Sequence, residues 1–559
     1  MNENRNFILA MLLMCGVLAG WQYLMPEQSA HTTKQTGNQQ IAHQKDAAAP
    51  LANFSVGMPA AVQDLPAEMV DFESSELSGK ISLKGIKIAD AKLKKHKETI
   101  SKDSGPVVLL KDSGQESYYA EAGWASIDKH IKLPDENTIW STGNKKLSPS
   151  SPLILTWDNG QGLVFKRTIE IDGKNLITVK QDVLNNGSQS LKISAYVLIR
   201  RVGLPEGAGR FAMIHEGGVG YFGGKLHEVA YDKMAKEALS YHGFDGGWAG
   251  ITDKYWLSAI VSTSTSTIKF REISGYGKPT YQVDTLTDIS DLAPGGVVSS
   301  TSHIFLGAKD LDVLDGYEQK LGVKHFDLAI DFGWFYFITR PLFLLLNWLG
   351  NNIANMGLII IIMTLLFKLI FFPLANKSYR SMNKMREIGP KLKSIQQLYA
   401  NDRARLSQET MNLYKKEKVN PLGGCLPQLI QFPILFALYK VFSISIDMRH
   451  CRFLWIGDLS EADPTSVLTL FGLIPITLPD FLCVGALPIL MGLTMLIQQK
   501  MGPAPADPTQ AKMFLIMPVV FTFMMAQFPA GVILYWTLSN VLSIIQQWAI
   551  GKLSKTSKP

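Results

Sequence analysis

Lys368 is the residue whose type and position best support a chemical role. It lies in an apolar run at 353–374, about six residues (~9 Å along a helix) from the end of that run. A charged side chain at that depth in a bilayer costs about 3 kcal/mol. The predicted membrane spans contain no Asp or Glu that could pair with the ammonium group. Lys368 must therefore face water, lose its proton or extend its side chain to the interface.

Thr364 precedes Lys368 by one helical turn and shares its face, which favours a polar groove over simple extension to the interface. Other polar residues in the predicted spans could complete such a groove. Taken singly, each would be expected to form a hydrogen bond between two helices. They are Gln428, Gln431, Gln498, Gln499, Thr522, Gln527, Thr537, Ser539, Asn540, Ser543, Gln546 and Gln547.

Residues 376–418 predict a helical hairpin, because apolar residues recur at spacings of three to four on both sides of a turn at 399–402. Asp402 is placed to cap the second helix. The rest of the hairpin surface is basic and could dock an anionic partner such as lipid headgroups, ribosomal RNA or an acidic receptor. The candidate docking residues are Arg380, Lys384, Arg386, Lys391 and Lys393. A solvated hairpin with no partner is the alternative.

The sequence offers no support for an enzyme. Gly218–Gly223 matches the dinucleotide-binding glycine pattern, but no strand–helix–strand unit surrounds it. The chain has no nucleophile elbow, P-loop or HExxH motif, and its histidines lack metal-ligand spacing. We therefore expect no cofactor, no metal and no small-molecule substrate.

The elements that position these residues are predicted to be membrane spans. Apolar residues make up 47% of the 559-residue chain, which excludes a disordered protein, and four cysteines exclude a disulfide scaffold. The six predicted spans are 7–25, 353–374, 425–446, 484–500, 513–528 and 530–550. We interpret 7–25 as an uncleaved anchor rather than a signal peptide, because no small-residue cleavage site follows it. Residues 466–483 are apolar but broken by prolines, which predicts a re-entrant or interfacial loop.

Charges in the short loops predict the orientation. Residues 375–420 carry eleven Lys and Arg against four acids, whereas 444–466 carries a net charge of −2. Both termini, 375–420 and 501–512 are therefore predicted to be cytoplasmic, and residues 26–350 periplasmic. This arrangement predicts a multi-pass protein of the inner membrane.

The exported part reads as an all-β domain. Short alternating runs separated by turn residues predict an antiparallel sandwich over 61–330, with strands at Lys80–Ile88, Gly162–Ile171, Leu176–Val183, Leu191–Ile199, Trp256–Val261 and Thr267–Phe270. We divide the remainder into an anchor (1–25), a linker (26–60), an interfacial amphipathic helix (331–350), a five-span core (351–550) that includes the hairpin 375–420, and a basic tail (551–559).

The stretch from 331 to 550 resembles the YidC family of membrane protein insertases. The resemblance rests on KSYRSMNKM (377–385), VNPLGGCLPQLIQFPILFALY (419–439), FLWIGDLSEADP (453–464), PILMGLTM (488–495) and FPAGVILYWTLSNVLSIIQQ (528–547). It implies a periplasmic β-supersandwich and a five-helix core around a hydrophilic groove. It also places Lys368 where the family usually carries Arg, and Thr364, Gln431 and Trp536 in the groove or along the substrate path.

The implied function is that of an insertase and folding chaperone. Nascent membrane proteins would be its clients, with the Sec translocon (SecYEG and SecDF), the ribosome, the signal-recognition-particle receptor and membrane lipids as partners. A small-solute transporter is the first alternative, but it predicts internal repeats and an acidic coupling residue that the sequence lacks. A membrane-anchored carbohydrate-active enzyme is the second, and it predicts a cluster of acids or histidines within 61–330.

Overall fold

The chain forms two compact units in this computed structural model. One comprises residues 28–331, and the other comprises residues 1–27 with 332–559. The structure describes residues 68–112, 116–128, 130–205, 207, 214–273, 277–333, 335–399, 402–417, 426–467, 469, 483–502 and 508–556. The predicted anchor (1–25), the linker (26–60) and most of the predicted re-entrant loop (466–483) lie outside the described residues.

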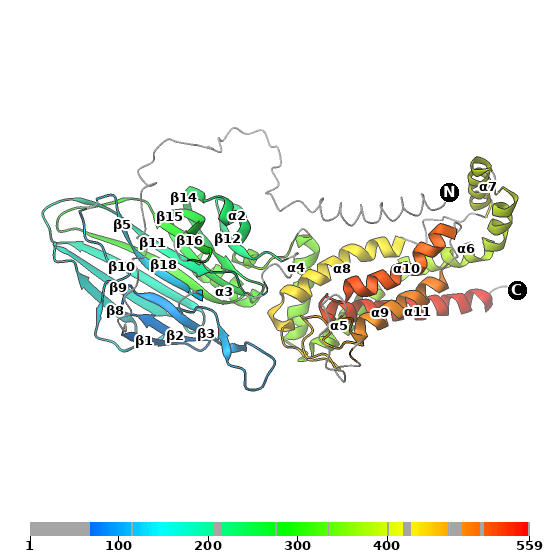
Figure 1. Cartoon of the computed structure of the whole chain (residues 1–559), viewed down its shortest axis with the longest axis horizontal. Coiled ribbons are helices and arrows are strands. Elements are labelled where there is room, and N and C mark those ends of the chain that lie inside the picture. Colours follow the sequence, from blue (N-terminus) through cyan, green and yellow to red (C-terminus); the bar gives the residue numbers. More distant parts are fainter. Residues whose placement is uncertain are drawn as a thin grey trace. The chain divides into compact units, whose positions relative to one another are not determined.

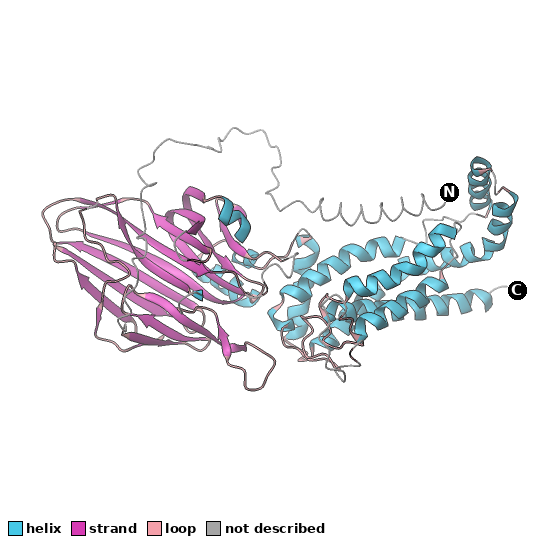
Figure 2. Cartoon of the chain, viewed as in Figure 1, coloured by secondary structure: helices cyan, strands magenta, loops and turns pink. Residues whose placement is uncertain are grey.

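Antiparallel strands build most of the first unit (Figures 1 and 2). They are β1 (Met69–Glu73), β2 (Leu77–Ser82), β3 (Lys87–Lys97), β4 (Pro106–Val108), β5 (Tyr118–Ser126), β6 (Ser141–Thr142), β7 (Lys146–Leu147), β8 (Leu153–Asp158), β9 (Leu163–Ile171), β10 (Leu176–Asn185), β11 (Leu191–Val202), β12 (Gly217–Phe222), β13 (Lys225–Ala230), β14 (Leu239–Thr252), β15 (Trp256–Ile273), β16 (Thr280–Thr287), β17 (Ser290–Leu292) and β18 (Val297–Ala308).

The long strand β15 connects the two halves of this sheet system. Its first part pairs with β18, which continues through β10 and β9 to β8. Its second part pairs with β16, which continues through β11 and β5 to β3, β2 and β1. One strand thus belongs to both halves, which is how a sandwich can form from one continuous hydrogen-bonded system.

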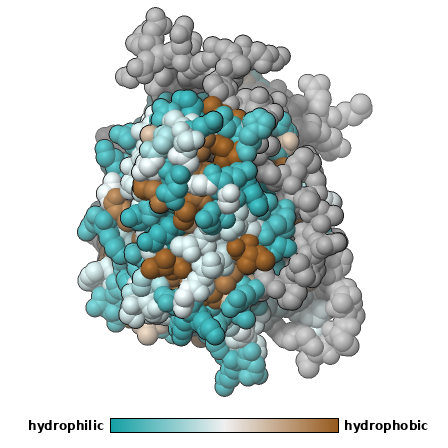
Figure 3. All heavy atoms as spheres, turned by 90° about the vertical axis from the view of Figure 1, so that its left-hand side faces the viewer, coloured by the Kyte–Doolittle hydropathy of each residue, from teal (hydrophilic) through white to brown (hydrophobic). Residues whose placement is uncertain are grey.

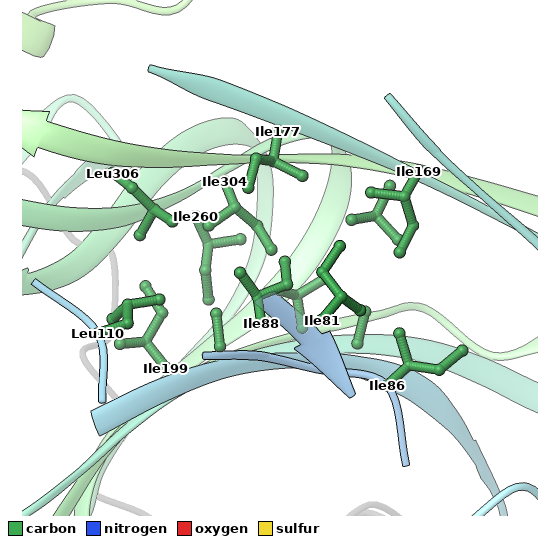
Figure 4. Packing of buried hydrophobic residues seen from close by; sticks show 14 of the residues in the cluster. Ile81, Ile86, Ile88, Leu110, Ile169, Ile177, Ile199, Ile260, Ile304 and Leu306 are labelled. Carbon is green, nitrogen blue, oxygen red and sulfur yellow. The ribbon is translucent and has the colours of Figure 1, made fainter. Parts of the chain in front are cut away.

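Alternation along the strands places the apolar core between the two halves. In β9, Phe165 and Ile169 are buried while Lys166 and Glu170 are exposed. Figure 4 shows Ile169 and Ile177 from one half facing Ile81 and Ile88 from the other. Figure 3 shows mostly hydrophilic side chains on one face, with hydrophobic residues in small separate groups.

The structure corrects three details of the β prediction. The run Lys80–Ile88 is two strands, because Gly85 and Ile86 adopt positive φ angles of 69° and 51° in a tight turn. The predicted strands at 256–261 and 267–270 are one strand. The unit also holds helices α2 (Tyr231–Lys236) and α3 (Leu311–Leu321), so it is mostly rather than entirely β.

Helices build the second unit. They are α4 (Tyr336–Gly350), α5 (Met356–Ile370), α6 (Phe372–Leu398), α7 (Arg403–Lys416), α8 (Leu426–Ile444), α9 (Ala486–Met501), α10 (Pro508–Met525) and α11 (Ala530–Thr556). Large apolar side chains are exposed on several of them, including Leu369 on α5, Leu493 on α9 and Leu515 on α10. Such extended apolar exposure is typical of surfaces that contact lipid or another protein.

The predicted span 353–374 is interrupted. Helix α5 ends at Ile370, and α6 starts at Phe372 with Pro373 in its first turn, because proline fits the start of a helix but not its interior. Among the described helices, none is by itself both long enough and apolar enough for a bilayer crossing. Helices α5 and α6, bent by 66° relative to each other, meet those two criteria only when taken together.

Candidate functional site

A row of polar residues follows one face of helix α11. Trp536, Asn540, Ser543 and Gln547 follow one another at spacings of three or four residues, and Ser539 is adjacent to Asn540. All five are at least nine-tenths buried. Helix α11 packs against α5, α8 and α9. The polar face of α11 is therefore directed into the helical unit, where its groups need hydrogen-bond partners.

Lys368 contacts this face. Its Nζ atom donates a hydrogen bond of 2.7 Å to the Ser543 hydroxyl, which in turn donates to the Ser539 carbonyl at 2.9 Å. The described residues bring no carboxylate within ion-pair distance of the ammonium group. Lys368 lies in the last turn of α5, closer to a helix end than the sequence indicated, because the helix stops at Ile370.

Gln431 reaches the same face from another helix. Its Nε2 atom donates to the Ser539 hydroxyl at 3.1 Å. We name Lys368, Gln431, Ser539 and Ser543 the polar seam. Through it, α5 and α8 are hydrogen-bonded to two serines one turn apart on α11. Two predicted groove residues, Lys368 and Gln431, therefore contact the same face of α11.

The other two predicted groove residues lie outside this hydrogen-bonded set. Thr364 is fully buried, and its hydroxyl donates to the Ile360 carbonyl of its own helix at 2.6 Å. Trp536 is buried with its ring 5.8 Å from that of Phe521, and its Nε1 atom has no partner among the described residues. Helical spacing placed Thr364 on the face of Lys368, and the family resemblance placed Trp536 in the groove or along the substrate path. Neither side chain is bonded to Lys368.

Ser539 and Ser543 are central to the seam, although the sequence predicted them only as two of twelve polar residues that could complete a groove. Their spacing of four, in register with Trp536 and Gln547, was the available signal. Asn540, next to Ser539 on α11, makes a second polar contact. Its Nδ2 atom donates to Thr494 Oγ1 of α9 at 3.2 Å. Polar side chains thus connect α11 to three neighbouring helices.

The basic hairpin consists of α6 and α7, and Asp402 caps α7 as predicted by accepting from the Arg405 amide at 3.0 Å. Lys391 pairs with Glu417 at 2.7 Å, and this hydrogen bond lowers the pKa of Glu417. Arg386 donates to the Met501 carbonyl at 3.3 Å, which ties α6 to the end of α9. Arg380, Lys384 and Lys393 are exposed, as are Arg386 and Lys391.

The seam contains one cationic group, that of Lys368. An ammonium group among apolar helices, bonded to a neutral hydroxyl, would gain more from a carboxylate, because attraction between opposite charges adds to the hydrogen bond. Among the described residues, no group of three His, Cys, Asp or Glu could hold a metal ion. The charged group of the seam is the Lys368 ammonium, which could bind an anionic group.

Comparison with known families covers almost the whole chain. Residues 348–558 match the family described as 60Kd inner membrane protein, and residues 69–345 match the family described as YidC periplasmic domain. The chain is 43% identical to the membrane protein insertase YidC of Rickettsia akari, over 99% of this chain and 100% of that protein. It is 42% identical to the insertase YidC of Methylobacterium radiotolerans, over 98% and 95%.

Solved structures resemble the chain less closely. An active YidC insertase crystal structure aligns with a TM-score of 0.34 and 14% identity, covering 86% of this chain and 93% of that one. A galactose mutarotase related enzyme from Lactobacillus acidophilus aligns with a TM-score of 0.30 and 11% identity, covering 43% and 97%.

The matches of both parts of the chain and the full-length relatives lead to one conclusion. The chain belongs to the YidC family of membrane protein insertases, which are inner-membrane proteins with a periplasmic domain and are not enzymes.

Proposed function

We propose that this chain moves nascent transmembrane segments from the cytoplasm into the inner membrane by way of the polar seam, alone or with the Sec translocon. The observation that carries the proposal is the hydrogen bond between Lys368 and Ser543, a cation held among apolar helices with only a neutral partner. A hydrophilic or acidic part of a client would take the place of Ser543 at the ammonium group. The apolar part of the client would then move into lipid.

The energetic reason for such a seam is the cost of moving polar groups through hydrocarbon. Each unsatisfied backbone group in the bilayer core costs several kcal/mol. Hydroxyl, amide and ammonium groups on α5, α8 and α11 would satisfy those groups during transfer. We infer that these residues line a hydrophilic groove, with Thr364 and Trp536 on its flank. The polar groups would lower the barrier without nucleotide consumption.

The proposed topology has six spans. Helices α5, α8, α9, α10 and α11 would supply five, with the apolar segment 7–25 as the anchor. Both termini would be cytoplasmic and residues 26–350 periplasmic, with α4 as the interfacial helix. The net charge of +7 at 375–420 and of −2 at 444–466 supports this orientation. The domain limits given above complete the proposal.

The hairpin would dock the partners that deliver clients. Arg380, Lys384, Arg386, Lys391 and Lys393 lie exposed on one helix, α6, where they could contact lipid headgroups, the ribosome or the signal-recognition-particle receptor. Lys391 also pairs with Glu417, and Arg386 ties α6 to the end of α9, so Arg380, Lys384 and Lys393 are the better candidates for contacts that depend only on charge.

Depletion of the native protein and complementation with Lys368 variants tests the proposal. Insertion of a single-span client is scored by protease protection, with protein amounts in the membrane as the control. We expect Lys368→Arg to support insertion, and Lys368→Ala and Lys368→Glu to fail. Normal insertion by all three variants would show that the cation has no role in transfer.

A further inference from the structure

The segment 446–467 of the helical unit lies against the starts of helices α5, α9 and α11. We propose that Asp463 in this segment is a positioning residue for insertion. It fixes the first turn of α9 next to the first turn of α11, and so holds the two helices that carry Thr494 and the serines of the polar seam. Hydrogen bonds join this segment to helix ends that are remote from it in sequence.

Asp463 caps helix α9 from outside that helix. Its Oδ2 atom accepts from the Leu487 amide at 2.8 Å, and its Oδ1 atom accepts from the Thr465 hydroxyl at 2.6 Å. The Thr465 oxygen accepts from the Ala486 amide at 3.0 Å. First-turn amides have no partner within their own helix, and a carboxylate there also interacts favourably with the helix dipole. Two residues of the segment thus satisfy the first two amides of α9.

The same segment also caps helix α11. The Ala530 amide donates to the Glu461 carbonyl at 2.7 Å, and the Gly531 amide donates to the Leu459 carbonyl at 2.9 Å. Residues 459–465 therefore bind the starts of both helices. Because α9 and α11 are held by neighbouring parts of one short segment, their first turns have a fixed separation.

Close packing leaves this segment little freedom. A Cβ atom at Gly485 would lie 2.6 Å from the Asp463 carboxyl carbon, and one at Gly531 would lie 3.2 Å from the Leu459 carbonyl oxygen. A Cβ atom at Gly357 of α5 would overlap the ring of Phe453. A side chain at any of these three glycines would require neighbouring atoms to shift, and this close approach favours one arrangement of the helix starts.

Asp463 would act on insertion through these helices and not by contact with a client. Fixing the starts of α9 and α11 maintains the Asn540–Thr494 bond, and it keeps Ser539 and Ser543 in place for Gln431 and Lys368. Any opening between α9 and α11 that admits a client is then confined to the opposite ends of these helices.

A cysteine cross-link tests the positioning directly. In the full-length chain with its native cysteines replaced by serine, Thr494→Cys and Asn540→Cys report contact between α9 and α11. We expect Asp463→Ala and Thr465→Val to lower the cross-link yield roughly fivefold, the effect of losing a cap of about 1 kcal/mol. Thr465→Ser keeps the hydroxyl and should restore the yield. Insertion, measured in chains without the engineered cysteines, should follow the same order.

Asp458→Ala is the matched control. Asp458 is as buried as Asp463, at 7% exposed, and it accepts from the Ser460 amide and hydroxyl in the same local motif, but these bonds stay within the segment. It should leave the cross-link and insertion close to those of the unmodified chain. If Asp463→Ala does not accumulate in the membrane, the pair Thr465→Val and Thr465→Ser decides.

Several outcomes would overturn the proposal. An unchanged cross-link in Asp463→Ala and Thr465→Val would do so, as would equal losses in Asp458→Ala, or a lost cross-link with normal insertion. The proposal relies on the proposed function only for its insertion readout. The cross-link reports helix contact whether or not Lys368 proves necessary, so the two proposals can fail separately.

Discussion

At the scale of single residues, the distinctive feature is a cation whose partner is neutral. The Lys368 ammonium group donates a hydrogen bond to the Ser543 hydroxyl, and the Ser543 hydroxyl donates one to the Ser539 backbone carbonyl. Compared with an arginine, a lysine presents a compact point charge without the two-pronged geometry that binds a carboxylate in parallel. If the proposed function holds, we expect Lys368 to accept client polar groups in varied orientations.

The hydrogen bond to Ser543 should contribute to stability as well as to function. Ser543→Ala leaves the ammonium group without this acceptor, and hydrogen bonds to charged groups contribute about 1.5–3 kcal/mol. We expect a lower midpoint of thermal unfolding in detergent. Thr537→Val is the control, because among the described residues the Thr537 hydroxyl bonds only to the Ile533 carbonyl of its own helix. Equal shifts for both variants would argue against a special role for Ser543.

At the scale of elements, close helix contacts depend on small residues. Gly492 of α9 faces Thr522 of α10, and a Cβ atom at Gly492 would lie 2.1 Å from the Thr522 hydroxyl oxygen. Small residues allow helices in membranes to approach closely. Helices α9 and α10 are thus packed at the distance that glycine permits.

This contact predicts a non-additive pair of substitutions. Gly492→Ala should lower stability by about 1–3 kcal/mol through overpacking. Adding Thr522→Ala removes the clashing oxygen, so the double variant should unfold at a higher temperature than Gly492→Ala alone. Additive effects in a double-mutant cycle of thermal midpoints would contradict the close contact.

In the hairpin β12–β13, a buried histidine should make stability depend on pH. His227 stacks on Phe222 with ring centroids 4.1 Å apart, and burial lowers the pKa of His227 from 6.5 to about 4. In the unfolded chain the histidine binds a proton below about pH 6.5, whereas in the folded chain it stays neutral until about pH 4. Protonation therefore favours unfolding, and stability should fall as the pH drops from 6.5 to 4.

The comparison of unmodified chain and His227→Phe checks this response. The variant keeps an aromatic ring on Phe222 but cannot bind a proton, so its unfolding midpoint should fall less over this pH range. Other groups titrate equally in both proteins, and their effects cancel in the difference. Parallel pH curves would contradict the assignment to His227.

Strand periodicity and local caps were predictable from sequence, whereas contacts between distant segments were not. The alternation in β9 and the Asp402 cap each depend on neighbouring residues. Helix α3 was missed although Asp310 caps its start and Gly322, at φ 66°, ends it, because these signals lay within a β-rich region. The polar residues of α11 could be recognised, but their pairing with Lys368 and Gln431 depends on tertiary packing.

At the scale of the whole molecule, the chain divides into two units with separate cores. The β unit buries its own apolar cluster between two sheet halves, and the helical unit exposes apolar surface on α5, α9 and α10. The β unit contains most of the stretch that matches the YidC periplasmic domain family, and the helical unit contains the stretch that matches the 60Kd inner membrane protein family. The division predicts that the β unit folds on its own.

Independent folding can be tested by producing residues 68–331 alone. We expect this fragment to unfold cooperatively, with a thermal midpoint close to that of the β unit in the full-length chain, because a domain with its own core is stable by itself. Circular dichroism at strand wavelengths measures both proteins. A fragment that fails to fold, or that melts far below the intact chain, would show that the units depend on each other.

The central claim is that Lys368 acts on a charge in the client, and a charge exchange tests it most directly. Two single-span clients that differ only in one intramembrane residue, Asp or Lys, are presented to the unmodified chain and to Lys368→Glu, and insertion is scored by protease protection. We expect the unmodified chain to favour the acidic client and Lys368→Glu to reverse this preference. Equal effects of Lys368→Glu on both clients would contradict it.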